Sequence, residues 1–320
     1  MNPHYFTEYK THSNIHIAST QGKKHIALIY GGMSAEREVS KSSGQGIENA
    51  LVAMGYQVTS IDMGADIAEV LAKVQPDLVF NALHGTYGED GCLPGLLNML
   101  RIPYTHSGVL ASALAFDKVK SKELFLAHEF SQAKSILISA DMGYQDDPMP
   151  RPYVIKPVNQ GSSVGVEIIF EGDDFFFSDY SFAYGDILVE EYIQGREMQV
   201  GVLNGEALGA LEIQLINKRF YDYEAKYTEG FTRHLMPAPI SKESYSALLS
   251  LAEKAYKALG CNGMARVEFI YQETKNEFYI LELNTHPGFT PLSICPEIAN
   301  AVGISFHQLL EEMMASAKYE

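Results

Sequence analysis

The chain contains 320 residues, of which 46% are hydrophobic and 20% are charged, as in an ordinary globular protein with room for two or three domains. Its formal net charge of −16 argues against nucleic acid as a partner, because phosphate neutralisation needs clustered Lys and Arg. No apolar run approaches the length of a membrane span, the N-terminus lacks an apolar signal core, and three scattered cysteines show no CxxC spacing. We therefore expect a cytoplasmic protein with reduced thiols and no membrane partner.

The N-terminal part of the chain alternates between predicted strands and helices. Residues 1–24 are polar and lack hydrophobic periodicity, and we expect them to form a flexible extension. The elements that follow are a strand, a helix, a strand, a helix and a strand, at residues 25–30, 33–54, 57–61, 66–74 and 78–82. This order predicts a doubly wound parallel sheet, in which ligands bind at the carboxyl ends of the strands.

Two of these strand ends have unusual sequences. Residues 31–38 combine a glycine turn with a helix start that carries acidic residues, and residues 84–91 read HGTYGEDG. Glycine permits a ligand to approach the backbone closely. The same features also fit helix-dipole complementarity in the first loop and a tight turn in the second, so both interpretations stay open at this point.

The middle of the chain suggests a phosphate-binding loop. An apolar strand at residues 151–157 contains Lys156 near its end and is followed by the small residues of NQGSSVG. Backbone N–H groups of such a turn can bind phosphate oxygens, and a lysine adds positive charge. The GxxxxGK[ST] pattern of a Walker loop is missing from the sequence, and a hairpin with a solvent-reaching lysine is the alternative.

Other segments of the chain are less specific. A short strand is predicted at residues 102–105 and a helix at 110–129, whose lysines at 118, 120 and 122 do not stand out, because a charge run on a helix usually faces solvent. Residues 217–234 are polar, aromatic and irregular, as in a lid over a site. The remaining predicted elements are strands at 187–189, 198–203 and 207–214, a helix at 241–259 with Ser241 as N-cap, and a closing helix at 296–317.

A predicted hairpin near the C-terminus gathers hard oxygen ligands. Period-two alternation places Arg266 with Glu268 on one face of a strand, and Glu282 with Asn284 on one face of the next strand. Pairing of the two strands would bring these four side chains together. Mg²⁺ takes oxygen ligands of this kind, usually together with substrate phosphates. The alternative is a half-buried sheet with one solvent-exposed face. However, an unpaired carboxylate is costly to bury in so apolar a strand.

Six motifs in this order resemble the D-alanine–D-alanine ligases of the ATP-grasp superfamily. They are YGGMSAEREVSKSSG, HGTYGEDG, IPYTHSGVLASALAFDK, IKPVNQGSSVGV, YDYEAKY and LELNTHPGFTPLS, and the resemblance covers residues 25–315. It implies an α/β protein with the ATP-grasp fold, in three domains. These are an N-terminal Rossmann-like domain with a doubly wound parallel sheet (25–106), a small central α+β domain (107–193) and a C-terminal α+β domain (194–320) that contains the lid.

The resemblance also implies the activity. Such an enzyme uses ATP to join two D-alanines through a D-alanyl phosphate intermediate, and so supplies peptidoglycan precursor synthesis. A carboxylate is a poor acyl donor, which is why ATP must first convert it to an acyl phosphate. The implied partners are ATP, two Mg²⁺ ions for which Mn²⁺ can substitute, two molecules of D-alanine and a second copy of the chain in a homodimer.

Roles around the two amino-acid substrates follow from the same resemblance. Glu36 would bind the ammonium group of the first D-alanine and be tied through Ser162 to Tyr227 of the lid. His84 would lie near this first substrate, and Ser293 would fix the carboxylate of the second.

The resemblance further assigns residues to the nucleotide. Those implied are Lys118, Lys156, Ser163, Glu190, Glu191, Ile193, Glu197 and Lys226. The lysines would contact the phosphates, with Lys226 at the transferred one, and the loop at Ser163 would fold over them. Residues 190–193 would meet the adenine edge, and Glu197 the ribose hydroxyls.

The metal ligands and the oxyanion hole complete the implied site. Glu268, Glu282 and Asn284 would hold the two Mg²⁺ ions. Arg266 and the backbone N–H of Gly288 would stabilise the oxyanion that forms when the second amino acid attacks. A guanidinium beside a backbone N–H is chemically suited to that charge.

The sequence departs from the family pattern at several positions. Glu268 stands where Asp is usual, Pro94 and Asn98 replace Gln and Glu, His106 replaces Gly, and His286 replaces Ser. A longer carboxylate can still bind Mg²⁺ but would shift the ion or change its denticity. Pro94, Asn98 and His106 concern packing near the first substrate and the dimer contacts. His286, together with Phe289 in place of Met, stands beside the oxyanion hole, where it could tune the pH dependence or be a bystander.

Two other functions have to be weighed. D-alanine–D-lactate ligases resemble this chain, but they tend to carry His where this sequence has Tyr227, so the tyrosine favours the dipeptide. A nucleotide-binding relic without activity should have lost phosphate, metal or oxyanion groups, yet Lys156, Arg266 and Glu282 are all present. We therefore predict the dipeptide ligase.

Overall fold

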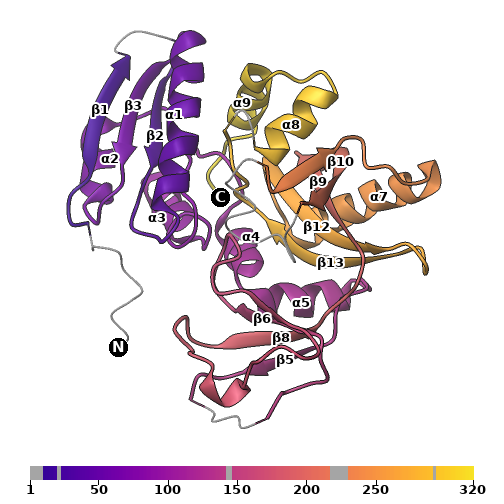
Figure 1. The fold of residues 1–320 in the computed structure, drawn as a ribbon. Coiled ribbons are helices and arrows are strands. Elements are labelled where there is room, and N and C mark those ends of the chain that lie inside the picture. The colour runs from indigo at the N-terminus through magenta and orange to yellow at the C-terminus, as the bar shows by residue number, and fades with distance from the viewer. Residues whose placement is uncertain (1–9, 20–22, 142–145, 217–229, 291–292) are drawn as a thin grey trace.

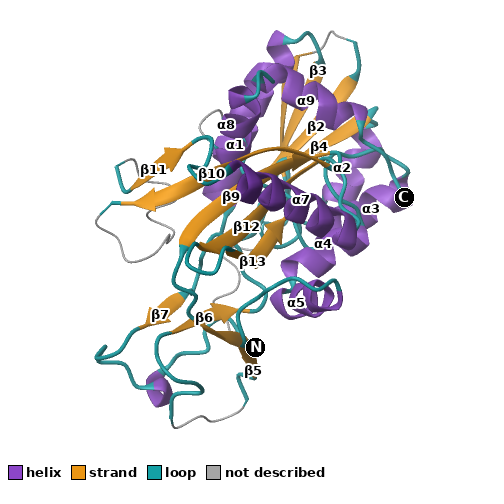
Figure 2. Ribbon diagram, turned by 90° about the vertical axis from the view of Figure 1, so that its right-hand side faces the viewer, coloured by secondary structure: helices purple, strands orange, loops and turns teal. Residues whose placement is uncertain are grey.

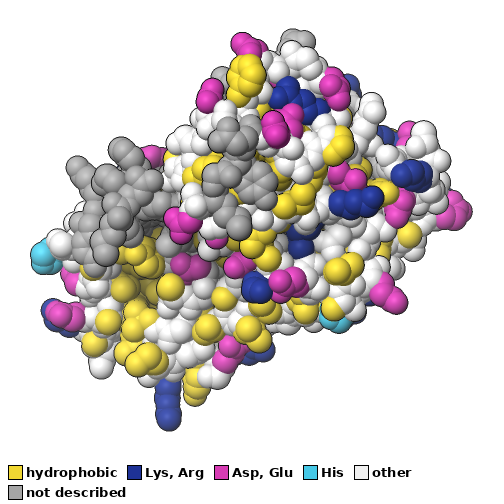
Figure 3. Space-filling model, turned by 90° about the horizontal axis from the view of Figure 1, so that it is seen from below, with side chains coloured by type: hydrophobic (Ala, Val, Ile, Leu, Met, Phe, Trp, Pro, Cys, Tyr) yellow, Lys and Arg dark blue, Asp and Glu magenta, His cyan; other side chains and the backbone are white. Residues whose placement is uncertain are grey.

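The computed structural model describes residues 10–19, 23–141, 146–216, 230–290 and 293–320. The chain builds three sheets, which follow one another along the sequence (Figure 1). Helices gather around the first and third sheets, whereas loops make most of the connections of the second (Figure 2). Lys and Arg side chains lie scattered among Asp and Glu on the face seen in Figure 3. None of the described helices is long and apolar enough to span a membrane.

The first sheet contains the predicted parallel strands. Its order is β1-β3-β2-β4, with β1 (Asn14–Ser19), β2 (His25–Tyr30), β3 (Gln57–Asp62) and β4 (Leu78–Asn81). The helices around it are α1 (Arg37–Ala53), α2 (Ile67–Val74) and α3 (Cys92–Leu100). Alternate side chains of β2 enter different cores, Ile26 and Leu28 with α1, and Ala27 and Ile29 with α2 and α3. Both faces of the sheet are therefore buried, as the doubly wound prediction requires.

The predicted extension over residues 1–24 is wrong for Asn14–Ser19, which form β1 antiparallel to β3. Ile15 and Ile17 of this strand are 50% and 60% exposed, so no buried face marks the strand in the sequence. The ordering comes from the open edge of β3, whose unpaired N–H and C=O groups offer backbone hydrogen bonds to a neighbouring segment.

The second sheet presents one face to the rest of the molecule. Its order is β5-β8-β6-β7, with β5 (Ser135–Ile138), β6 (Tyr153–Pro157), β7 (Glu167–Ile169) and β8 (Ile187–Glu191), all in antiparallel pairs. A short 3₁₀ helix, η2 (Phe177–Asp179), covers its core. Tyr153 and Ile155 of β6 lie in that core. Strand alternation therefore sends Val154 and Lys156 to the other face, where both line a cavity.

The third sheet carries the predicted hairpin. Its antiparallel order is β11-β10-β9-β12-β13, with β9 (Arg196–Leu203), β10 (Glu206–Leu215), β11 (Thr232–Leu235), β12 (Met264–Gln272) and β13 (Glu277–Asn284). Val267 and Phe269 of β12 belong to the core beneath α7 (Lys242–Leu259). Arg266 and Glu268 alternate with them and therefore lie on the opposite face.

Two helices predicted as continuous are each divided in two. They are α4 (Val109–Phe116) with α5 (Lys118–Ala127), and α8 (Ile294–Ala301) with α9 (Phe306–Ala315). Asp117 adopts an extended conformation and accepts hydrogen bonds from two N–H groups of α5, so it caps a new helix. Ser305 does the same for α9 through a capping box with Gln308.

The other predicted elements differ less from those in the structure. The strand predicted at 102–105 is reduced to isolated bridges at Tyr104. Helix α7 begins after Ser241, whose hydroxyl accepts a hydrogen bond from the Ser244 N–H, as predicted for its N-cap. Phe125 and Phe130, on and just after α5, pack into the core of the third sheet rather than of the second.

Candidate active site

Two adjoining cavities contain nearly all of the predicted site residues. The first, of about 490 Å³, lies between the second and third sheets, and the second, of about 590 Å³, lies between the first and third sheets. Both are lined by Lys118, by residues 160–162 and by Glu282. A group bound in one cavity would therefore lie next to a group bound in the other.

The predicted hairpin is confirmed by the register of β12 and β13. Glu268 lies opposite Glu282, and Arg266 lies opposite Asn284. The register shifts immediately after Glu268, which is a sign of a β-bulge. Four residues from two strands thus meet where the cavities adjoin, as their spacing in the sequence predicted.

The oxygen atoms of this hairpin are already engaged within the protein. Oε1 of Glu268 accepts hydrogen bonds from Arg266 Nε at 3.0 Å and Nη2 at 2.5 Å, and its Oε2 accepts one from Gln199 Nε2 at 3.1 Å. Oδ1 of Asn284 accepts the backbone N–H of His286 at 2.8 Å. Asn284 Oδ1 can accept a further interaction, because an amide oxygen has two lone pairs, whereas Glu268 Oε1 already accepts two hydrogen bonds from Arg266.

The donor set suits Mg²⁺ only together with a substrate. The described residues contain no group of three or more His, Cys, Asp or Glu placed to hold a metal ion. The predicted ligands are two carboxylates and one amide, and Mg²⁺ completes such a set with phosphate oxygens and water. Gln199 Oε1, on the side chain that donates to Glu268, is buried and finds no hydrogen-bond partner within the described ranges. The residues therefore fit a site for hard cations that is completed by a polyphosphate.

Buried ion pairs hold the lysine of the predicted phosphate loop. Glu190 on β8 contacts Lys122 Nζ at 2.5 Å and Lys156 Nζ at 2.6 Å. Burial alone would raise the pKa of Glu190, but the charges of Lys156 and Lys122 outweigh it and lower that pKa to about 2. Burial disfavours charge on Lys156 as well, yet Glu190 raises the pKa of the lysine. Lys156 thus keeps a positive charge at the wall of the first cavity, with Glu190 between it and Lys122.

Most of the other residues predicted for the nucleotide also line the first cavity. Those present there are Lys118, Ser163, Glu190, Glu191, Ile193 and Glu197. The Lys118 ammonium donates to the Gln160 carbonyl at 2.5 Å, which fixes the start of the small-residue loop. The predicted residues Lys226 and Tyr227 lie outside the described residues, as does most of the predicted lid, residues 217–234. Thr232–Leu235 belong to strand β11.

A hydrogen bond between two predicted residues closes one side of the second cavity. The Ser162 hydroxyl donates to the Glu36 carboxylate, which is 6% exposed. Ser162 and Ser163 have φ of 49° and 59°, in the left-handed region that few residues other than glycine adopt. A Cβ on the preceding Gly161 would lie only 2.5 Å from Glu36 Oε1, so glycine is required where the loop passes the carboxylate.

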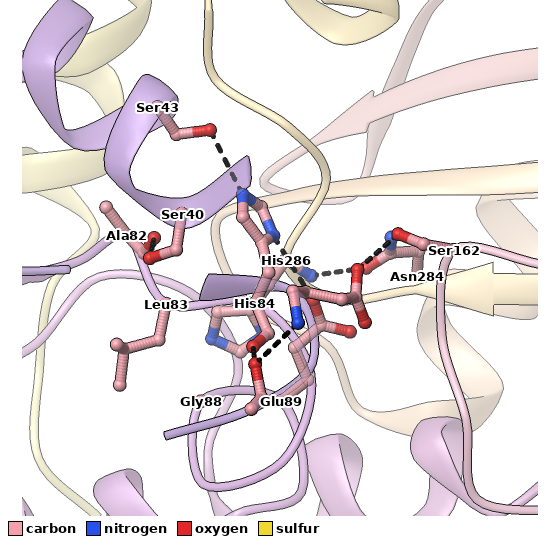
Figure 4. A network of polar contacts seen from close by, with 12 residues as sticks. Ser40, Ser43, Ala82, Leu83, His84, Gly88, Glu89, Ser162, Asn284 and His286 are labelled. Carbon is pink, nitrogen blue, oxygen red and sulfur yellow. Dashed lines mark hydrogen bonds and ion pairs between the residues drawn. The ribbon is translucent and has the colours of Figure 1, made fainter. Parts of the chain in front are cut away.

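His84 lies on the wall opposite this loop. Its Nε2 is 3.1 Å from the Ser43 hydroxyl and its Nδ1 is 3.3 Å from Glu89 Oε1 (Figure 4). Burial alone would lower the pKa of His84, but the hydrogen bond and charge of Glu89, with a further contribution from Glu36, raise it. The ring is thus held between a hydroxyl and a carboxylate.

The predicted oxyanion and carboxylate sites are also adjacent. Arg266, Gly288 and Ser293 all line the second cavity. The Ser293 hydroxyl accepts the Thr290 N–H at 3.1 Å, which fixes its position. A Cβ on Gly288 would lie 2.9 Å from the Ser293 oxygen, so glycine keeps this approach open.

The structure also shows polar residues that the sequence did not single out. Lys122 was grouped with a solvated charge run, although it follows Lys118 by four residues and so shares its helix face. Gln199 donates to Glu197 at 2.9 Å as well as to Glu268, and thereby links a predicted ribose contact to a predicted metal ligand. Its position two residues after Glu197 on one strand is the only local signal. The departures Pro94 and Asn98 lie on α3, where Asn98 accepts the Glu320 N–H.

Comparison with protein families gives two matches that together cover most of the chain. The model described as "D-ala D-ala ligase C-terminus" matches residues 132–315, and "D-ala D-ala ligase N-terminus" matches residues 64–107. Among curated proteins, the D-alanine--D-alanine ligase of Rickettsia felis is 60% identical over 99% of both chains, and that of Rickettsia akari is 61% identical over the same shares.

Solved structures give the same result. The D-alanine--D-alanine ligase of Bacillus anthracis superimposes with a TM-score of 0.80 at 29% identity, over 92% of this chain and 97% of that one. A complex of that enzyme with ATP gives 0.79 at 26% identity over the same shares. VanG D-Ala:D-Ser ligase from Enterococcus faecalis gives 0.74 at 29% identity, over 92% of this chain and 99% of that one. The predicted resemblance and the α/β ATP-grasp fold class are thereby confirmed, and this chain belongs to the D-alanine–D-alanine ligase family.

Proposed function

We propose that this protein uses ATP to join two molecules of D-alanine to D-alanyl-D-alanine, releasing ADP and phosphate, and so supplies peptidoglycan precursor synthesis. Identity of 60% to a D-alanine--D-alanine ligase over 99% of both chains carries the proposal. The two adjoining cavities support it, because acyl activation by ATP needs the phosphates and the amino acid side by side.

The first step transfers the terminal phosphoryl group of ATP. A carboxylate oxygen of the first D-alanine attacks the phosphorus, ADP leaves, and D-alanyl phosphate remains. Glu36 would hold the ammonium group of this substrate in the second cavity, with His84 near it. Lys118 and Lys156 would bind phosphate oxygens from the first cavity. Glu268, Glu282 and Asn284 would hold two Mg²⁺ ions, or Mn²⁺, which when bound supply charge neutralisation at the phosphates.

The second step forms the peptide bond. The neutral amine of the second D-alanine attacks the carbonyl carbon of D-alanyl phosphate, and phosphate leaves as the tetrahedral oxyanion collapses. Arg266 and the Gly288 N–H would stabilise that oxyanion, and one such donor contributes roughly 3 kcal/mol. Ser293 would orient the substrate through its carboxylate.

The assay that tests this function offers competing acceptors. Purified protein is incubated with ATP, Mg²⁺ and D-alanine, with D-lactate or D-serine added in parallel samples, while ADP release is followed and products are weighed by mass spectrometry. We expect D-alanyl-D-alanine as the main product in every sample. A depsipeptide as the main product would replace the proposal by the D-lactate alternative. A folded protein that binds ATP but releases no ADP would support the alternative of a nucleotide-binding relic without activity.

We also propose that the protein is a cytoplasmic homodimer. The neighbouring helices α3 and α4 expose Met99 at 84% and Leu110 at 69%, an apolar surface that a second copy could cover. Light scattering after size exclusion should give twice the chain mass of 35.5 kDa, and Leu110→Glu should shift it towards the monomer.

A further inference from the structure

Two buried histidines from distant parts of the chain stack on each other beside the second cavity. His106 follows the first sheet, and His286 follows β13. Their ring centroids are 4.5 Å apart with planes 20° from parallel, and the two residues are 2% and 1% exposed. Phe289 meets the His106 ring edge to face at 5.6 Å. The stack therefore joins the first sheet to the loop that begins at Asn284.

Hydrogen bonds fix the orientation of the His286 ring. Asn81 Oδ1 accepts the Leu83 N–H at 3.1 Å, so its Nδ2 must be the amide donor. Nδ2 donates to the Gly88 carbonyl at 3.1 Å and lies 3.0 Å from His286 Nε2, which must then accept. The proton of His286 therefore resides on Nδ1, 2.9 Å from the Thr285 hydroxyl.

A closed circuit of contacts returns from Asn81 to His106. The backbone N–H of Asn81 donates to the Thr105 hydroxyl at 3.1 Å, and this hydroxyl is 3.0 Å from His106 Nδ1. His106 stacks on His286, which meets the Asn81 side chain. The stack of the two rings is the only link in this circuit that is not a hydrogen bond or a covalent connection, so removing either ring opens it.

The backbone conformation of His106 indicates that its side chain has a role. Its φ is 75°, in the left-handed region where glycine is free of steric cost and most other residues are strained. A histidine held there gains something through its ring that glycine cannot supply. The contacts of that ring are the stack with His286, the edge contacts with Phe80 and Phe289, and the hydrogen bond to Thr105.

We propose that His106 and His286 are positioning residues for the ligation, whose stacked rings hold the loop of residues 284–288 against the loop of residues 83–89. The first of these loops carries Asn284 and the Gly288 N–H, and its His286 N–H holds the Asn284 side chain at 2.8 Å. The second carries His84 and Glu89. The stack fixes the His286 ring where it meets Asn81, whose amide also donates to Gly88 of the second loop, and so helps to set the distance between the groups that hold the first substrate and those that stabilise the oxyanion. This inference rests on the proposed function.

The test compares variants that separate the ring from the backbone strain. His106→Gly relaxes the backbone but removes the ring, and we expect kcat to fall about tenfold or more, because small displacements of reacting groups are costly. The KM for ATP should stay within about twofold, since neither histidine lines the first cavity. His106→Phe keeps an aromatic ring and should recover most of the kcat. The double variant His106→Gly/His286→Ser should be no slower than the slower single variant, because both changes open one circuit.

A matched control separates positioning from loss of stability. Phe125 is a fully buried ring that meets Phe130 edge to face in the core of the third sheet, away from both cavities. Phe125→Leu should lower the thermal midpoint but leave kcat at the wild-type value when measured well below that midpoint.

Three results would overturn the inference. They are an unchanged kcat in His106→Gly, a fall in kcat no larger than that of Phe125→Leu at equal thermal destabilisation, and a double variant whose loss equals the product of the single losses. A wild-type protein that forms no dipeptide would instead overturn the proposed function, so the two failures are distinguishable.

Discussion

The two cavities differ in the polar contacts that support their walls. In the first, charged side chains neutralise one another, as Glu190 does with Lys122 and Lys156. Beside the second, the circuit through Asn81, Thr105 and the stacked histidines is made of neutral groups, and burial lowers the pKa of His106 to about 3. A site for a polyanion needs charges that are present before the ligand arrives. A site that aligns two reacting groups needs fixed distances, which directional hydrogen bonds and packed rings supply.

Arg266 stands at the border of the two cavities and gives the largest expected effect. Arg266→Ala should reduce turnover below detection, because it removes the charged donor proposed for the oxyanion, a loss of at least about a hundredfold. ATP binding should remain largely intact, since Arg266 lines the second cavity. Steady-state kinetics and calorimetric titration with ATP measure the two effects separately.

The control for this variant is Arg266→Lys, which keeps the charge but not the planar fork that meets Glu268 through two nitrogens. We expect turnover between those of wild type and Arg266→Ala. Loss of nucleotide binding together with activity in Arg266→Ala would contradict the proposed role, and it would mean that Arg266 belongs to the first cavity.

Glu190 tests whether charge compensation stabilises the first cavity. Its pKa is lowered from 4.5 to about 2 by Lys156 and Lys122, against the effect of burial. A carboxylate with a lowered pKa contributes stability that is present above its unfolded pKa and lost as pH falls through the folded one. Glu190→Gln should therefore reduce the free energy of unfolding at pH 7 by about 3 kcal/mol. The difference from wild type should shrink between pH 4.5 and about 2.

Urea unfolding at a series of pH values measures this difference. Glu191→Gln is the matched control, because it removes the neighbouring carboxylate, which within the described residues accepts only a backbone N–H from Lys134. Its effect on the free energy of unfolding at pH 7 should be smaller, because it removes a carboxylate that accepts a backbone N–H rather than one that pairs with Lys122 and Lys156. A difference between wild type and Glu190→Gln that stays constant down to pH 2 would show that the lysines do not set the protonation of Glu190.

The parts of the site that the sequence predicted are those that depend on local alternation. Arg266, Glu268, Glu282 and Asn284 meet because their two strands are joined by a short turn, so period-two spacing and one hairpin are enough to place them. The buried strand at residues 25–30 was equally plain, because both of its faces are apolar. Family motifs added the roles, which the spacing alone left open.

The parts that the sequence did not predict depend on pairs of residues far apart in the chain. Lys122 looks like one charge in a solvated run until the fold brings β8 against it. His106 and His286 each looked like an isolated departure, and only the packing of the loop after β13 against the first sheet shows them to be one stack. Helix breaks at Asp117 and Ser305 were missed because a capping residue within an apolar run resembles a polar position on a helix surface.

The N-terminal strand β1 lines neither cavity, and we expect changes at its start to have the smallest effect. The Ser13 hydroxyl donates to Asp66 Oδ1 at 2.7 Å and accepts the Gly64 N–H at 2.9 Å, just before β1 begins. Ser13→Ala should lower the free energy of unfolding by about 1 kcal/mol, the usual contribution of such a hydrogen bond. It should leave kcat unchanged, because none of these residues lines either cavity.

Thr11→Ala is the control for this variant, since within the described part of the chain the exposed Thr11 hydroxyl forms a hydrogen bond only with its neighbour His12. Equal stabilities of Ser13→Ala and Thr11→Ala in urea would mean that edge pairing with β3 alone orders β1. A lower kcat in Ser13→Ala would have a different meaning. It would connect β1 to the site through Asp62, which lies at the end of β3 and binds Arg37 near the start of α1, the helix that Glu36 precedes.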